Sequence, residues 1–183
     1  MNNKQLIAIS SPSGGGKTTI VKEILRRHPL LKFSISATTR KKRNGELDGK
    51  DYFFKTEEEF QELISNNKLV EYEELFGNYY GTLKSEIDNS IRDNETMIFD
   101  VDVNGALNIK KIYPNNSKLI FIQPPNIATL QQRLRERNTE SEGGLEKRFQ
   151  RISLELEAGK IFDKIIINNK LEEAIKEVEK EIE

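Results

Sequence analysis

The sequence predicts an α/β fold in which helices cover both faces of a parallel sheet. Two patterns predict it. Short apolar runs recur along the 183 residues, and stretches with apolar residues at helical spacing separate them. Strands that alternate with helices in this way are typical of parallel sheets, because such sheets are buried on both faces.

Length and composition narrow the class of protein. A chain of 183 residues is expected to form one domain, here spanning residues 4–183. The net charge of −1 disfavours a nucleic-acid partner, and no run approaches the roughly 20 apolar residues of a membrane helix. Cysteine is absent, which excludes disulfides and thiolate chemistry. We expect a cytoplasmic enzyme or binding module, as a monomer or homodimer.

The first predicted strand is the apolar run LIAIS at Leu6–Ser10. The next predicted element is a helix at Lys17–His28, whose apolar residues fall on one face. Pro29 ends this helix because proline cannot continue the hydrogen-bond ladder.

The later elements follow the same alternation. The further strands are expected as apolar runs at Phe33–Ser36, Met97–Val103, Lys118–Ile122 and Lys164–Asn168. The further helices are expected from apolar stripes at Lys84–Asn94, Ala106–Ile112, Asn126–Arg137, Leu145–Lys160 and from Leu171 onward.

Two regions depart from this alternation of strands and helices. Residues 36–83 are aromatic and charged and are interpreted as an insertion, in which Thr56 and Glu59 form a capping box at the start of a helix. The rest of the insertion is expected to form short antiparallel strands that turn at Gly77-Asn78. Residues 126–150 hold a polar, glycine-containing loop between helices and are interpreted as a lid. The remaining core comprises residues 1–35, 84–125 and 151–183.

The stretch SSPSGGGKTT, Ser10–Thr19, approaches the phosphate-loop pattern G-x-x-x-x-G-K-[ST]. Gly16, Lys17 and Thr18 fit its second half, whereas Ser11 stands where the first glycine belongs. A flexible turn that caps a helix is the alternative. The position directly between a buried strand and a helix favours a phosphate site, since backbone N–H groups and the helix N-terminus then face the anion. The predicted binding residues are Ser11, Pro12, Ser13, Gly14, Gly15, Gly16, Lys17, Thr18 and Thr19.

Asp100 and Asp102 lie at the end of a predicted strand. Ligands of α/β sheets bind beyond the carboxyl ends of the strands, although two surface aspartates in a turn are the alternative. The period of two places both on one side of the strand. One carboxylate, with the hydroxyl of Thr18, is expected to support Mg²⁺ or its waters while the other serves a substrate.

Several segments, which follow one another in the family's order, resemble the guanylate kinases over nearly the whole chain, from about Lys4 onward. They are SPSGGGKT, S-A-T-T-R-x-x-R-x-G-E-x-D-G-x-D-Y-x-F, V-E-Y, G-N-Y-Y-G-T, D-V-D-V-N-G and R-L-R-E-R with T-E-S-E. The resemblance implies a P-loop NTPase three-layer fold with a central parallel sheet, a small mixed α/β insertion that binds the nucleoside monophosphate, and a helical lid. It also implies transfer of the γ-phosphoryl group of ATP to GMP, and to dGMP, with Mg²⁺ as the cofactor.

The resemblance also implies roles for individual residues. Residues expected to hold the GMP phosphate are Ser36, Arg40, Arg43, Tyr52 and Tyr80, with Glu46 bracing the second arginine. Residues expected to read guanine are Glu71, Thr82 and Asp102. Arg133, Arg137 and Arg148 fall in the lid, and Asn168 is placed near adenine with the ATP-binding residues Arg133 and Arg137. Residues expected to act in catalysis are Lys17, Arg40, Arg43, Arg137 and Arg148; Thr18 and Asp100 are expected to hold the metal.

The chemistry of these residue types agrees with such roles. Paired arginines clamp a phosphate dianion with bidentate hydrogen bonds, and a carboxylate such as that of Glu71 accepts from the two donors on one edge of guanine. The lid arginines have an alternative, in which Arg133 and Arg137 merely extend over Leu130 and Leu134. Two departures from the family pattern are Ser11 for glycine and Lys42 for proline. The rival functions are an inactive guanylate-kinase-like interaction module and a kinase with another small phosphorylated acceptor.

Overall fold

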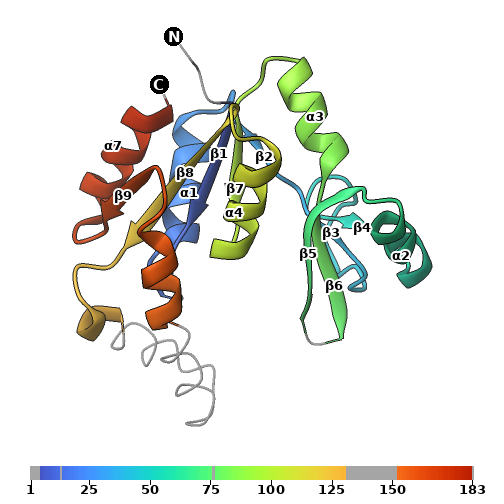
Figure 1. Ribbon diagram of the computed structural model, residues 1–183. Helices are drawn as coiled ribbons and strands as arrows, with labels where there is room; N and C mark the ends of the chain where they lie inside the picture. The colour runs from blue at the N-terminus through green and yellow to red at the C-terminus, as the bar shows by residue number, and fades with distance from the viewer. Residues whose placement is uncertain (1–4, 13, 76, 131–151, 183) are drawn as a thin grey trace.

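The computed structural model describes residues 5–182 with the exception of residues 13, 76 and 131–151. It contains two sheets, which lie side by side in Figure 1. The larger sheet forms the body of the molecule. The smaller one belongs to the insertion and projects to one side.

The larger sheet has the strand order β2-β7-β1-β8-β9, and every pair is parallel. Its strands are β1 (Leu6–Ser10), β2 (Lys32–Phe33), β7 (Met97–Asp100), β8 (Ser117–Gln123) and β9 (Lys164–Ile167). Because all five strands run in one direction, their carboxyl ends share one edge. The residues that follow β1, β7 and β9 are therefore brought to one edge of the sheet.

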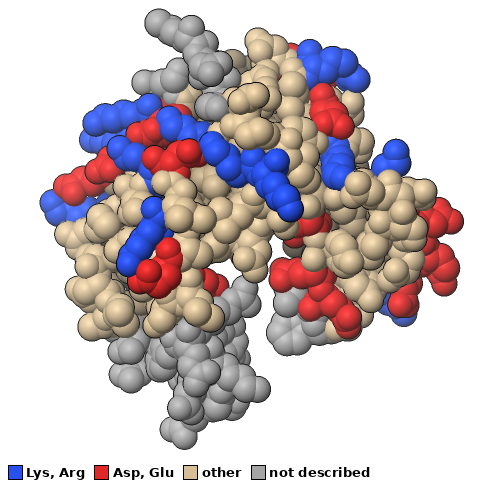
Figure 2. Space-filling model, viewed as in Figure 1, with Lys and Arg blue, Asp and Glu red and all other residues tan. Residues whose placement is uncertain are grey.

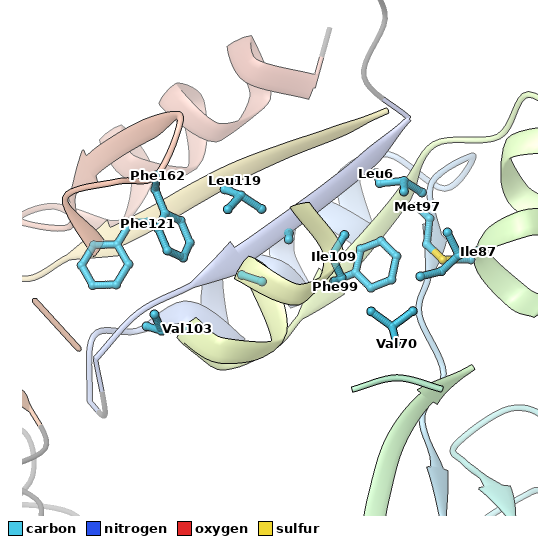
Figure 3. Packing of buried hydrophobic residues seen from close by; sticks show 12 residues of the cluster. Leu6, Val70, Ile87, Met97, Phe99, Val103, Ile109, Leu119, Phe121 and Phe162 are labelled. Carbon is cyan, nitrogen blue, oxygen red and sulfur yellow. The ribbon is translucent and has the colours of Figure 1, made fainter. Parts of the chain in front are cut away.

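Helices cover both faces of this sheet (Figure 1). They are α1 (Lys17–Arg27), α3 (Lys84–Arg92), α4 (Val103–Ile112) and α7 (Leu171–Ile182), together with helical residues 127–130 and 152–159. Ile7 and Ile9 of β1 pack with residues of α1 and α7, whereas Leu6 and Ala8 pack with residues of α3 and α4 on the other face (Figure 3). Successive side chains of β1 thus point to opposite faces of the sheet and enter both apolar layers. The predicted α/β fold with a central parallel sheet is confirmed.

The insertion has its own sheet, of strand order β4-β3-β6-β5, and its own small core. Its elements are β3 (Ala37–Thr38), β4 (Phe53–Phe54), α2 (Glu57–Ser65), β5 (Leu69–Leu75) and β6 (Asn78–Leu83). The predicted capping box at α2 is present, because the Thr56 hydroxyl accepts from the Glu59 N–H and the Glu59 carboxylate accepts from the Thr56 N–H. Phe60 is fully buried and stacks on Tyr79 with ring centroids 5.4 Å apart.

The insertion packs against the body through its strand β5. Val70 of that strand packs with Ile87 of α3 and Ile109 of α4 in the apolar cluster of the larger sheet (Figure 3). One residue of the insertion sheet thereby belongs to the core of the body. This contact fixes the neighbouring Glu71 relative to α4.

Several predicted boundaries are wrong. The strand expected at Phe33–Ser36 ends at Phe33, and after one further ladder bond from Ser34 N–H to the Ile98 carbonyl (2.9 Å) the chain crosses into the insertion. The strand expected at Met97–Val103 ends at Asp100, because Asp102 caps α4 and starts that helix before Ala106.

The antiparallel expectation for the insertion holds for β5 with β6, which turn at Gly77 (φ 71°), and for β3 with β6. It is wrong for β3 and β4, which are parallel. The parts of the expected helices at Asn126–Arg137 and Leu145–Lys160 that fall within 131–151 lie outside the described residues. In the part of the chain that is described, no helix has the length and apolarity needed to cross a bilayer.

Candidate functional site at the carboxyl edge of the sheet

The phosphate loop leaves the end of β1 and leads into α1. Gly14 (φ 85°) and Gly16 (φ 93°) both adopt the left-handed conformation that glycine tolerates best, and Gly16 caps the amino end of α1. The Gly15 N–H donates to the carbonyl of Pro12 at 2.9 Å, which closes a tight turn. The loop therefore has the compact shape in which backbone N–H groups at a helix start face an anion.

Ser11 occupies the first loop position without strain. Positive φ occurs at other residues but not at Ser11, so this position does not demand glycine. A Cβ atom on Gly15 would lie 2.8 Å from the Cβ atom of Ser11. The requirement for glycine thus falls on Gly15, which packs directly against the serine side chain.

Lys17 is the first residue of α1 and points across the carboxyl edge of the sheet. Its ammonium group donates to the carbonyl of Val101 at 2.8 Å and forms an ion pair with Asp100. Both side chains are 17% exposed. A partly shielded cation of this kind stands at the place where the loop would receive phosphate oxygens.

The residues expected to hold a metal offer the right kind of ligand. Thr18 is exposed in the first turn of α1, and Asp100 ends β7. Hydroxyl and carboxylate oxygens are ligands that Mg²⁺ prefers, and this ion usually takes its other ligands from water and substrate phosphates. Among the described residues, no three or more His, Asp or Glu side chains are grouped so that they could hold a metal ion.

The side chain of Arg40 is surrounded by a carboxylate and two aromatic rings of the insertion. Its guanidinium donates to Glu46 at 2.7 and 3.1 Å, and it lies over the rings of Tyr52 and Phe54 at 5.2 and 5.8 Å from their centroids. The hydrogen bonds from Arg40 lower the pKa of Glu46, and the same pairing raises the pKa of Arg40. The carboxylate and the two rings thus hold the guanidinium of Arg40 in one orientation.

Glu46 interacts with the two arginines in different ways. It binds the side chain of Arg40 but only the backbone N–H of Arg43, at 2.7 Å. The side chain of Arg43 is exposed. The carboxylate therefore fixes the first guanidinium and the turn that carries the second.

Tyr52 neighbours Tyr80 through its ring and Ser36 through a shared hollow. The rings of Tyr52 and Tyr80 meet edge to face, with centroids 6.1 Å apart. Ser36 and Tyr52 border a hollow of about 190 Å³ between the insertion and the body, and Figure 2 shows a gap between these two parts. The residues that line the hollow are Phe33, Ser34, Ser36, Asp51, Tyr52, Asp100 and Val101.

Glu71, Thr82 and Asp102 come together where β5 and β6 approach α4. The Thr82 hydroxyl donates to Oε1 of Glu71 at 2.6 Å across the paired strands. Burial raises the pKa of Glu71, and the nearby carboxylate of Asp102 raises it further. Asp102 accepts from the N–H of Gly105 at 2.8 Å, and a Cβ atom on Gly105 would lie 3.3 Å from Oδ1 of Asp102 and 3.5 Å from Cγ of Glu71.

The structure places the remaining predicted residues as follows. Asn168 is buried against the phosphate loop, with its Nδ2 atom 2.9 Å from the carbonyl of Gly15. Pro12 is buried and Thr19 is exposed. The predicted residues outside the described part of the chain are Ser13, Arg133, Arg137 and Arg148.

Three contributors were missed in the sequence. The carbonyl of Val101 accepts from Lys17, the ring of Phe54 flanks Arg40, and the Thr38 hydroxyl donates to the carbonyl of Tyr79 at 2.8 Å while accepting from the N–H of Arg40 at 3.1 Å. A backbone carbonyl leaves no trace in a sequence. Thr38 and Phe54 stood within the motif around Arg40, but their roles depend on the pairing of β3 with β4 and β6.

Comparisons with known proteins agree on one family. A family model described as guanylate kinase matches residues 3–183. The guanylate kinase of Chlorobium luteolum is 42% identical over 174 residues, covering 95% of this chain and 88% of that protein. The guanylate kinase of Fusobacterium nucleatum is 44% identical over 169 residues, covering 92% and 90%.

A solved structure agrees with the sequence relatives. The crystal structure of guanylate kinase from Anaplasma phagocytophilum superimposes with a TM-score of 0.74 at 27% identity, covering 100% of this chain and 86% of that one. The family model, the relatives and this structure together confirm the resemblance seen in the sequence motifs. The chain belongs to the guanylate kinase family of enzymes.

Proposed function

We propose that this protein transfers the γ-phosphoryl group of ATP to GMP and to dGMP, yielding ADP and the nucleoside diphosphate. One observation carries the proposal. Asp100 pairs with Lys17 of the phosphate loop, and Asp102 lies beside Glu71 of the insertion. Two residues apart along an extended chain, the aspartates are at most about 7 Å apart at their Cα atoms, so the two candidate nucleotide sites are neighbours.

ATP binds on the loop at residues 11–18 in this proposal. The N–H groups at the start of α1 and the ammonium group of Lys17 bind its β- and γ-phosphates. Lys17 exchanges its contacts with Asp100 and Val101 for phosphate oxygens. The left-handed conformations of Gly14 and Gly16 support this assignment, because they give the loop its tight turn at the start of α1.

The GMP phosphate is held by Arg40, Arg43, Ser36, Tyr52 and Tyr80. Arg40 is oriented by Glu46 and by the rings around it, so little side-chain freedom is lost when the phosphate binds. The planar guanidinium groups match two phosphate oxygens each. The hollow supports this arrangement, because it is bordered by Ser36 and Tyr52 on one side and by Asp100, the partner of Lys17, on the other.

Guanine is read by Glu71, Thr82 and Asp102. An ionised Glu71 accepts from the N1–H and the exocyclic amine of the base, while adenine would leave that carboxylate unpaired. A half-buried carboxylate without a partner is costly, and sites of this kind reject analogues by roughly 10⁴–10⁵-fold. The neighbouring hydroxyl of Thr82, 2.6 Å away, keeps Glu71 in place.

Catalysis then consists of positioning and charge compensation. The acceptor phosphate is already ionised, so no dedicated base is required. Mg²⁺, held with the oxygens of Thr18 and Asp100, supplies positive charge to the phosphates when bound. The arginines of the lid at 126–150, Arg133, Arg137 and Arg148, supply further positive charge and exclude water.

A coupled ADP-release assay tests the proposal. ATP is supplied with GMP, dGMP, AMP, UMP or CMP at equal concentration, and we expect turnover with GMP and dGMP alone. Comparable rates with AMP would contradict the guanine assignment. Tight binding of both ATP and GMP with no ADP release above the ATP-only background would instead identify an inactive interaction module.

A further inference from the structure

Asn168 connects the end of β9 to the phosphate loop. The residue is only 5% exposed, and its Nδ2 atom donates to the carbonyl of Gly15 at 2.9 Å. Its backbone N–H donates to the carbonyl of Gln123 at 2.7 Å, which continues the pairing of β8 with β9. The side chain is therefore attached to the sheet itself, and it holds a loop that lies far away in the sequence.

This hydrogen bond fixes the direction of one peptide group. In a trans peptide the carbonyl and the following N–H point in opposite directions, and the described chain contains no cis peptide bonds. Because the carbonyl of Gly15 points at Asn168, the N–H of Gly16 points to the other side of the loop. Phosphate loops bind their anion with N–H groups directed into one concavity, so the bond aims a phosphate-binding donor that Asn168 itself does not touch.

The amide of Asn168 also packs closely against Gly16. A Cβ atom at Gly16 would lie 2.4 Å from Nδ2 of Asn168. Gly16 is consequently required for two reasons, its positive φ of 93° and this contact.

We infer that Asn168 is a positioning residue for the phosphate loop and acts through the Gly15–Gly16 peptide instead of through adenine. The inference rests on the proposed assignment of this loop to the ATP phosphates. Without the hydrogen bond, the peptide rotates among several orientations, and only some of them present the Gly16 N–H to phosphate. The apparent dissociation constant of a nucleotide rises in inverse proportion to the competent fraction.

The test compares Asn168→Leu with Asn169→Leu. Leucine keeps the branched shape of asparagine but cannot donate, and the same change at the exposed neighbour Asn169 is the matched control. Dissociation constants for ADP and for GMP are measured separately by calorimetry. For Asn168→Leu we expect ADP binding to weaken roughly tenfold or more, with GMP binding within twofold of wild type and Asn169→Leu unchanged for both.

Several outcomes would overturn the inference. They are ADP affinity within twofold of wild type in Asn168→Leu, an equal loss in Asn169→Leu, or an equal loss of GMP affinity. If Asn168→Leu does not fold, Asn168→Ala is measured in the same way. If neither folds, a crystal structure of the wild-type protein with ADP decides: an Asn168 amide turned away from Gly15 contradicts the inference, and a retained bond with the Gly16 N–H on a phosphate supports it. Because the readout is ADP binding, it stands even if GMP phosphorylation fails.

Discussion

Lys17 and Asp100 form an ion pair at the carboxyl edge of the larger sheet, and each side chain is only 17% exposed. The carbonyl of Val101 accepts from the same ammonium group at 2.8 Å. The cation of the phosphate loop is therefore engaged by the end of β7. An incoming phosphate competes with these acceptors for Lys17, which couples ATP binding to the state of Asp100.

Replacement of Lys17 by alanine is expected to reduce kcat/KM by about 10²–10³-fold, since it removes a positive group from developing phosphate charge. The steady-state ADP-release assay with ATP and GMP measures this. Lys22→Ala, on an exposed position of the same helix, is the matched control. Near wild-type turnover in Lys17→Ala would contradict the assignment of the loop.

Asp100→Asn separates two roles of one carboxylate. The neutral side chain competes less well for Lys17, so ADP is expected to bind several-fold more tightly in metal-free buffer. Activity at limiting Mg²⁺ is expected to fall, because the variant loses a charged oxygen ligand. Calorimetry with a chelator and a Mg²⁺ titration of the rate give the two values. Unchanged ADP affinity would show that the ion pair is irrelevant to nucleotide binding.

Glu71→Gln tests the reading of guanine. Glutamine keeps an oxygen that accepts from Thr82, but its amide cannot accept from both donors of the base. We expect the KM for GMP to rise by about 10²-fold or more, while the KM for ATP changes little. Glu74→Gln, at an exposed position of the same strand, is the control. Equal changes in both KM values would show that Glu71 does not contact the base.

The raised pKa of Glu71 predicts a dependence on pH. Its folded-state pKa exceeds the unfolded value because the side chain is buried and lies near Asp102. The folded protein therefore binds the proton more tightly, and the stability contributed by the protonated form is lost as pH rises from the ordinary value through the raised one. Glu71→Gln removes this loss, so we expect the variant to gain stability relative to wild type with rising pH. Urea denaturation across this range measures the difference.

The affinity for GMP is expected to depend on pH in the opposite sense to the stability. Only the ionised carboxylate accepts from both guanine donors, so GMP affinity is expected to fall as pH drops through the raised pKa of Glu71. The Glu71→Gln variant should show no such fall. A similar fall in the variant would place the titrating group elsewhere.

The sequence predicts the larger sheet better than it predicts the segments that leave it. The sequence identified β1 with its true bounds at Leu6–Ser10, because a short apolar run directly before a glycine-rich loop indicates a buried strand. All five residues are buried. The strand expected to run to Val103 failed, because an apolar run does not reveal that Asp102 caps a helix. The end of β2 failed for a similar reason, since the departure of the chain at Ser34 depends on where the insertion packs.

The candidate site shows the same division between local and long-range information. The loop glycines were accessible from their spacing along the chain, whereas the role of the motif around Arg40 was implied by the resemblance to guanylate kinases. The bond of Asn168 to Gly15 joins residues 153 positions apart and has no local pattern. The resemblance implied that Glu46 braces the second arginine, Arg43. Its carboxylate instead binds the guanidinium of Arg40 and the backbone N–H of Arg43, a choice set by the fold of the turn that joins them.

Gly159→Ala tests how the helix at 152–159 is seated on the larger sheet. An alanine Cβ atom there would lie 2.4–2.6 Å from three ring atoms of Phe121. That ring is fully buried and packs edge to face on Phe162, with centroids 5.3 Å apart, so it has nowhere to shift. Overpacking of this kind costs roughly 1–3 kcal/mol, which exceeds the gain of about 0.5–1 kcal/mol from replacing glycine in a helix. We therefore expect a lower free energy of unfolding in urea.

The double variant Gly159→Ala/Phe121→Leu distinguishes this clash from a general intolerance of alanine. Phe121→Leu alone leaves a cavity and should destabilise the protein, but in the double variant the alanine methyl group occupies part of that space. The double variant is therefore expected to lose less free energy of unfolding than the sum of the two single variants, by about 0.5–3 kcal/mol. Strict additivity would mean that Gly159 is required for its backbone and not for the ring it faces.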